Sequence, residues 1–351
     1  MKTIRASYFA LATLYLLCCA IPVLSQDTPD TASELARAAR SPYDIERFVE
    51  THTDFDWEPL WKALKITDQI EMAGCVKQGD AAHSCSSELI IVVGPLQAIL
   101  LLRRYDWDEV DLRFIGELQP DGLTRWHFAG HFEPHVHYFQ PEHRIVMFGN
   151  KPYLAVTQQG ESGLGMSTEL ESWIDLTRSE FVPVFSYTKG GHANGYDSIT
   201  RDSSGGVVWL QDQPMESITV EYRLSFTSED NIGREVPLGS KSDKAVFTRA
   251  DGGKFRVDDK LSTTSSEQIG FLYEDAYAGL SNEDFLRYDF PSLKEIASKA
   301  DSPEKRWLRK FLPNCKETPE KKQLSELLQT NSMLPSPRKQ SQPSKPRGNV
   351  R

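Results

Sequence analysis

The chain has 351 residues, with 40 basic and 50 acidic side chains and a formal net charge of −10. This length allows one large domain or two ordinary ones. The first 25 and the last 21 residues hold basic but no acidic side chains, so the body between them has 33 basic against 50 acidic residues, a net charge of −17. Such a body argues against nucleic acid as a partner and disfavours anionic membrane surfaces.

The first 25 residues have the pattern of a signal peptide. Lys2 and Arg5 form a basic start, Tyr8–Leu24 is almost wholly apolar, and Val23–Ser25 offers a cleavage site. We therefore expect a secreted or periplasmic protein. The alternative is a retained N-terminal membrane anchor, because 17 apolar residues are near the lower limit for spanning a bilayer. In that case the uncleaved leader would be the attachment to the membrane.

Cleavage of the leader would leave three cysteines, Cys75, Cys85 and Cys315. Export implies an oxidising compartment, so we predict a disulfide between Cys75 and Cys85. The alternative is that all three remain thiols. Cys315 is then the odd cysteine, and we expect it to pack against the C-terminal helices.

Residues 26–70 read as a helical lead-in. Ser41 is placed as an N-cap before Pro42, and Asp44 is placed to complete a capping box. A second apolar stripe, at Trp57, Leu60, Trp61 and Leu64, predicts another short helix whose aromatic rings belong to the core.

Residues 75–260 read as an antiparallel β core, because apolar and polar residues alternate and turn pairs recur. Residues 88–93 are apolar enough for a central strand, and 95–104 could be strand or helix. Alternating or apolar segments lie at 110–118, 123–132, 143–148, 153–157, 218–226, 245–249 and 254–257. Turn pairs lie at Asp121-Gly122, Gly149-Asn150 and Asp251-Gly252-Gly253, between successive segments.

Residues 280–330 return to helix. Ser281–Asp284 is a capping-box pattern, and Ser302-Pro303 and Thr318-Pro319 each put an N-cap residue before a proline. These starts predict a C-terminal αα-hairpin, followed by a disordered basic tail at 331–351. The fold class we predict is α+β, mainly antiparallel β as a sandwich or barrel-like sheet, in a single domain over 26–330.

Five of the eight histidines lie at 127, 131, 135, 137 and 143. If 123–133 is a regular strand, His127 and His131 share a polar face and lie about 13 Å apart, too far to bind one ion. His135 and His137, two residues apart on a strand, would point the same way about 6.6 Å apart. Imidazoles at that spacing can hold a transition metal ion.

Glu142 follows His137 after four residues, and Gly149 follows after six more. This pattern resembles the first conserved motif of the cupin family. The resemblance implies a small β-barrel in which His135, His137 and Glu142 ligate a divalent transition metal. Gly130 stands one residue too close to His135 for that motif. The second cupin motif is absent, since His192 lacks its proline and spacing.

The absence of other chemical motifs favours a non-catalytic, β-rich binding domain whose partner is an unknown small molecule, glycan or protein. The first alternative is a cupin-like metalloprotein or metalloenzyme that uses His135, His137 and Glu142. The second is an extracellular hydrolase, indicated only by the many carboxylates and the tryptophans. A Ser-His-Asp set would meet only in the fold, and the sequence selects none. Whether the protein is an enzyme stays open at this point.

Overall fold

The computed structural model describes residues 30–70, 72–76, 85–94, 96–104, 108–136, 140–163, 165–194, 199–208, 217–229, 233–274, 281–300 and 302–330. The chain divides into two compact units, Met1–Glu133 (unit 1) and Pro134–Arg351 (unit 2). The predicted leader and the predicted tail lie outside the described residues. The single domain expected over 26–330 stays a prediction.

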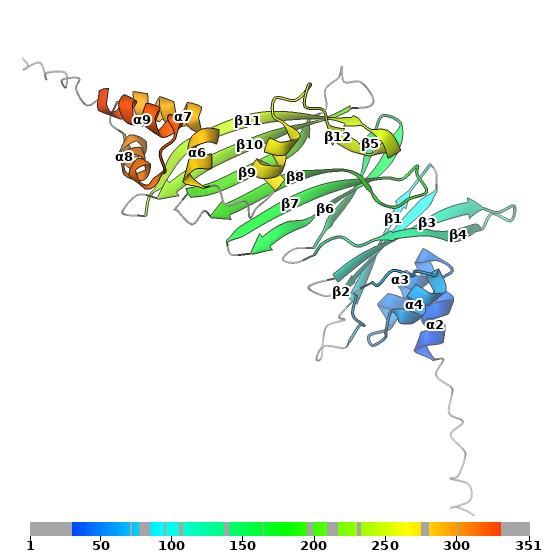
Figure 1. The fold of residues 1–351 in the computed structure, drawn as a ribbon. Helices are drawn as coiled ribbons and strands as arrows, with labels where there is room; N and C mark the ends of the chain where they lie inside the picture. Colours follow the sequence, from blue (N-terminus) through cyan, green and yellow to red (C-terminus); the bar gives the residue numbers. More distant parts are fainter. Residues whose placement is uncertain are drawn as a thin grey trace, which may run out of the picture. The chain divides into compact units, whose positions relative to one another are not determined.

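Unit 1 contains a four-stranded antiparallel meander in which the strands follow one another in chain order (Figure 1). Its strands are β1 (Cys85–Val92), β2 (Gln97–Arg104), β3 (Asp108–Leu118) and β4 (Thr124–Phe132). The segment that could have been strand or helix is therefore a strand, β2. The apolar segment expected at the centre of a sheet, β1, lies instead at an edge.

Three short helices of unit 1 cover one face of this sheet. They are α2 (Thr31–Ala38), α3 (Pro42–Thr51) and α4 (Glu58–Leu64). Trp57 and Leu60 are fully buried in the core between helices and sheet, as the apolar stripe predicts. Ser41 is the N-cap of α3, but its side chain makes no capping hydrogen bond, so the predicted capping box is wrong in that detail.

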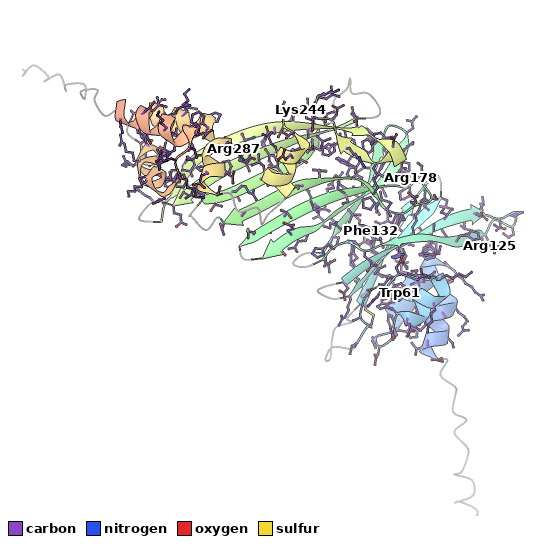
Figure 2. All side chains as sticks on the ribbon, viewed as in Figure 1. Trp61, Arg125, Phe132, Arg178, Lys244 and Arg287 are labelled. Atoms are coloured by element: carbon purple, nitrogen blue, oxygen red, sulfur yellow. A yellow bond between two sulfur atoms is a disulfide. The ribbon has the colours of Figure 1, made fainter. Side chains whose placement is uncertain are left out.

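The predicted disulfide between Cys75 and Cys85 is present (Figure 2). Cys75 also forms an isolated antiparallel bridge with Phe55, with N···O distances of 2.9 and 3.2 Å. The disulfide therefore joins the segment that follows the helices to the first strand of the sheet.

The sequence was misleading about one face of β3. Alternation predicts that Asp111 and Arg113 face solvent, yet both are buried. Burial of a charged side chain requires polar partners, and Arg113 Nε donates to Gln97 Oε1 at 2.7 Å. Alternation of polar and apolar residues identifies the strand, but it does not show whether the polar face is exposed to solvent.

Unit 2 contains an eight-stranded antiparallel meander, again in chain order. Its strands are β5 (Glu142–Phe148), β6 (Lys151–Gly163), β7 (Met166–Asp175), β8 (Pro183–Asn194), β9 (Ile199–Val208), β10 (Ser217–Glu229), β11 (Glu235–Arg249) and β12 (Phe255–Val257). The predicted turns at Gly149-Asn150 and Asp251–Gly253 join neighbouring strands. Within the described residues both sheets are open, and the predicted α+β, mainly antiparallel class is confirmed.

Helical segments cover one face of β10 and its neighbours. They are α5 (Ser266–Ile269), η2 (Gly270–Glu274), α6 (Asn282–Tyr288), α7 (Phe290–Ser298), α8 (Pro303–Phe311) and α9 (Pro319–Thr330), with short 3-10 turns η1 (Asp251–Gly253) and η3 (Leu312–Asn314). Helices α8 and α9 are the predicted C-terminal pair. Cys315 is buried beside them and is not part of a disulfide among the described residues. None of the described helices is long and apolar enough to cross a membrane.

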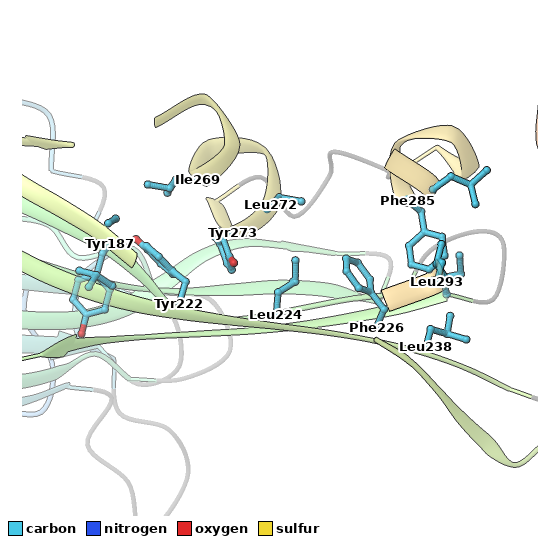
Figure 3. Close-up of a cluster of buried hydrophobic side chains, with 14 of the residues drawn as sticks. Tyr187, Tyr222, Leu224, Phe226, Leu238, Ile269, Leu272, Tyr273, Phe285 and Leu293 are labelled. Carbon is cyan, nitrogen blue, oxygen red and sulfur yellow. The ribbon is translucent and has the colours of Figure 1, made fainter. Parts of the chain in front are cut away.

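Strand β10 has the cleanest two-residue period in the chain. Its apolar side chains Tyr222, Leu224 and Phe226 are buried toward the helical segments. In Figure 3, Leu272 and Tyr273 lie over Tyr222 and Leu224, and Phe285 lies beside Phe226. The rings of Tyr222 and Tyr273 stack with centroids 4.5 Å apart, and those of Phe226 and Phe285 meet edge to face at 5.1 Å.

One carboxyl group lies in this core without full compensation. Asp289, between α6 and α7, is 2% exposed, and its Oδ2 has no hydrogen-bond partner. It lies against Gly239, where a Cβ would be only 2.6 Å from that oxygen. Burial raises the pKa of Asp289 to about 7, against the opposing effects of a hydrogen bond with Ser292 and the charge of Lys241.

This raised pKa predicts that the protein loses stability as the pH rises from about 4 to 7. In that window the folded state keeps a proton on Asp289 that the unfolded state has released, so deprotonation favours unfolding. At about 1.4 kcal/mol per pKa unit, the loss is about 4 kcal/mol above pH 7. We expect Asp289→Asn to unfold at higher denaturant concentration than wild type at pH 8, and at a similar concentration at pH 4. The exposed-site control Asp251→Asn should show no such pH-dependent gain, and equal gains in both variants would contradict the assignment.

The disulfide gives a second stability prediction. Its short loop implies that Cys75→Ser/Cys85→Ser lowers the free energy of unfolding by about 2–3 kcal/mol, because the unfolded chain regains entropy. Urea denaturation measures the change. In mass spectrometry after alkylation of the denatured, unreduced protein, Cys315 should carry the label and Cys75 and Cys85 should not. Labelling of all three would show that the bond is absent.

Candidate functional site

The histidines expected to share a face of β4 do not share it. Residue pairing between β3 and β4 shifts at Ala129, a β-bulge, so His127 lies opposite Ile115 whereas His131 lies opposite Leu112. Ile115 and Leu112 are three residues apart on β3 and point to opposite faces. His127 and His131 therefore do so too. Gly130, beside the bulge, has φ +146°, a backbone conformation that favours glycine.

Each of these two histidines has an acidic neighbour within unit 1. His127 Nε2 lies 3.2 Å from Glu117, and His131 Nε2 lies 3.8 Å from Glu133 and 3.9 Å from Asp68. The side chain of Glu117 is mostly exposed. These are surface pairs of the kind that contribute little to stability.

The residues that resemble the cupin motif are only partly described. His137 lies outside the described residues. The backbone N–H of His135 donates to Gln158 Oε1 at 3.0 Å. Glu142 begins β5, with its carboxylate 3.8 Å from Lys189 Nζ. A metal ion on Glu142 would have to compete with that ammonium group, so the proposed ligand set stays a hypothesis.

Two strands away from Glu142, on β7, unit 2 contains a buried carboxylate with a full set of donors. Glu171 Oε1 accepts from Arg144 Nη2 at 2.6 Å and from Trp173 Nε1 at 2.8 Å. Burial favours its neutral form, but these hydrogen bonds and the charge of Arg144 outweigh it and lower the pKa of Glu171. Burial, together with the nearby Glu171 carboxylate, raises the pKa of Tyr187. The group is held as a structural ion pair rather than presented to a ligand.

Unit 2 has an organised polar surface on the side of β7–β11 opposite the buried side of β10. Side chains directly opposite one another on antiparallel strands point to the same face. We name this surface the hydroxyl face and define it by residues that the pairing aligns: Ser167, His192, Asn194, Thr200, Asp202, Ser204, Glu221, Arg223, Ser225, Thr227, Ser240 and Ser242. All of them are exposed or partly exposed, and none is apolar.

One row of the hydroxyl face crosses five strands. Ser167 lies opposite His192, His192 opposite Asp202, Asp202 opposite Ser225, and Ser225 opposite Ser240. His192 Nδ1 lies 2.7 Å from Asp202 Oδ1. The two side chains are 45% and 50% exposed, so the pair is open to solvent.

A neighbouring row orients an amide. Asn194 lies opposite Thr200, and Thr200 Oγ1 donates to Asn194 Oδ1 at 3.2 Å. A Cβ on Gly165 would be 3.2 Å from Asn194 Nδ2. The amide nitrogen therefore lies beside the start of β7, two residues before Ser167.

A shallow depression lies on the same face over β9 and β10. It is lined by Ser204 to Val208 together with Glu221 and Arg223. Gly206 lies opposite Glu221 and carries no side chain on this face, whereas Gly205 lies opposite Tyr222 and faces the buried side. A Cβ on Gly205 would collide with the carbonyl oxygen of Thr188 and the ring of Tyr222.

Sequence reasoning missed this face. It assigned His192 no role, because His192 fits neither cupin motif and its partners are remote in the chain. Asp202 is ten residues away and Ser167 twenty-five, and only the hairpin register brings them together. The available signal was the run of Ser, Thr, Gly, Asp and His in 186–206, which is unusual for strands.

Comparison of the chain with protein-family models, curated proteins and solved structures finds no match.

The metal hypothesis makes a direct prediction. If His135, His137 and Glu142 hold an ion, mildly purified protein should contain close to one equivalent of a transition metal, and His135→Ala/His137→Ala should contain much less. Elemental analysis of both proteins measures this. Equal metal in the two, or far less than one equivalent in the wild type, would contradict the hypothesis.

Proposed function

We propose that the protein is an exported binding protein whose hydroxyl face binds a neutral, hydroxyl-rich ligand such as a glycan chain. The observation that carries the proposal is the register of β7–β11, which aligns exposed hydroxyl, amide and charged groups on one side of the sheet. The disulfide between Cys75 and Cys85 supports an oxidising compartment, which is consistent with export.

The composition of the hydroxyl face favours a neutral ligand over a charged one. Arg223 offsets one of the two carboxylates that define the face, Asp202 and Glu221, so the net charge of the face is small. Serine and threonine hydroxyls both donate and accept hydrogen bonds, as sugar hydroxyls do. A small apolar molecule would instead need an enclosed, apolar pocket.

The shape of the hydroxyl face favours an extended ligand. The pairs that define it run across five adjacent strands, about 4.8 Å apart, so the surface is wide and shallow. A chain of sugars can contact several rows at once. Each contact is weak because it replaces a hydrogen bond to water, and affinity then accumulates over the length of the chain.

Calorimetric titration with dextran, xylan and mannan tests the proposal. Arg223→Ala removes the longest donor of the face and should weaken binding of the preferred glycan about tenfold, equivalent to about 1.4 kcal/mol. Lys151→Ala removes one positive charge from an exposed position elsewhere in unit 2 and should leave the affinity unchanged. No binding of any of the three glycans, or equal loss in both variants, would overturn the proposal.

A further inference from the structure

The pair of His192 and Asp202 has the contact that prepares an imidazole to act as a base. Asp202 Oδ1 lies 2.7 Å from His192 Nδ1, so the carboxylate accepts the Nδ1–H of the neutral ring. That tautomer leaves the lone pair on Nε2. A carboxylate so placed also stabilises the imidazolium that forms when Nε2 takes a proton.

A hydroxyl group lies on the same face, on the strand paired with the other side of β8. Ser167 on β7 is directly opposite His192, whereas Asp202 is opposite it on β9. Cβ atoms of directly opposed residues are about 4.5–5.5 Å apart, a span that an imidazole ring covers. The order across the three strands is therefore hydroxyl, imidazole, carboxylate, and Ser167 is exposed.

An amide donor lies on the same face, on the strand paired with that of Ser167. Asn194 is two residues after His192 on β8, so both side chains are on one face. Because Thr200 donates to Asn194 Oδ1, the Nδ2 hydrogens remain for another acceptor. Nδ2 lies beside Gly165, whose φ of +81° turns the chain into β7.

We propose that Ser167, His192, Asp202 and Asn194 form an acyl-transfer site that hydrolyses carboxylic esters. Ser167 is the nucleophile, His192 the base, Asp202 the residue that orients the imidazole, and Asn194 the donor to the oxyanion. None of these four roles requires a metal ion or a cofactor.

The reaction balances with these groups and water. His192 Nε2 takes the proton of Ser167 as Oγ bonds to the ester carbonyl carbon, and the carbonyl electron pair moves onto oxygen, where Asn194 Nδ2–H donates to it. When that pair returns, the bond to the alcohol oxygen breaks and the imidazolium gives it the proton. Water then attacks the acyl-Ser167 by the same route, which releases a carboxylic acid and restores the serine.

The surroundings of Ser167 indicate the substrate class. The site is open and polar, with no apolar pocket for a long acyl chain among the groups that define the face. A short acyl group, such as acetate, carried on a hydroxyl-rich chain fits best. This substrate class rests on the proposed glycan binding, whereas the four catalytic assignments do not.

The test uses 4-nitrophenyl acetate, whose hydrolysis requires no glycan, so its outcome is separate from that of glycan binding. We expect Ser167→Ala to lose at least about 100-fold in kcat/KM and Asp202→Asn about tenfold or more. Asn194→Ala should lower kcat about 100-fold with little change in KM, because its hydrogen bond forms in the transition state. Ser298→Ala, at an exposed serine at the end of α7 and outside the hydroxyl face, is the matched control and should keep the wild-type rate.

A fluorophosphonate probe provides a second readout, since it forms a covalent adduct only with an activated serine. Peptide mass spectrometry should find the adduct on Ser167 in the wild type and not in His192→Ala. The proposal is overturned if the wild type hydrolyses the ester no faster than buffer. It is also overturned if Ser167→Ala retains the wild-type rate, which would mean that the imidazole acts alone, or if the probe labels another residue.

Discussion

Burial of every second side chain of β10 under the C-terminal helices is the constraint on which the rest of unit 2 depends. Tyr222, Leu224 and Phe226 enter the core. Because a strand has a period of two residues, their neighbours Glu221, Arg223 and Ser225 must face outward. Residues paired across neighbouring strands point to the same face, so the pairing fixes which side chains of β9, β8 and the start of β7 also face outward. The hydroxyl face is thus a consequence of how the hydrophobic core is closed.

Two buried carboxylates of unit 2 show how differently the fold treats charge. Glu171 receives donors from Arg144 and Trp173 and stays ionised at a lowered pKa. Asp289 leaves one oxygen without a partner, and burial favours its protonated form. The first arrangement is fully compensated and fixes the positions of its neighbours. The second costs stability at neutral pH, and it lies where the C-terminal helices meet β11, the contact that closes the core.

Much of the fold could be predicted from the sequence where the signal is local. Turn pairs such as Gly149-Asn150, the two-residue period of β10, the Ser-Pro start of α8 and the cysteine pair each depend on near neighbours. The register between strands, and whether a helix covers a given face of a sheet, depend instead on residues that are far apart in the sequence. A single bulge at Ala129 separated His127 from His131, and Asp111 was buried although its strand alternates. The pair of His192 and Asp202 could not be predicted for the same reason, because no pattern of neighbouring residues shows which side chains meet across two strands.

An ester hydrolase whose site lies on an open sheet face is exposed to bulk water, whereas a site in a cleft excludes most of it. Water competes on the open face for every hydrogen bond, so a small ester gains little binding energy. A long hydroxyl-rich chain changes this balance, because contacts along Ser204, Arg223 and Ser242 can hold it while one ester reaches Ser167. Binding energy from remote parts of such a substrate can then be used to position the reacting group. Wide polar binding and exposed acyl-transfer chemistry are therefore compatible on one surface, and a polymer is the substrate form that needs both.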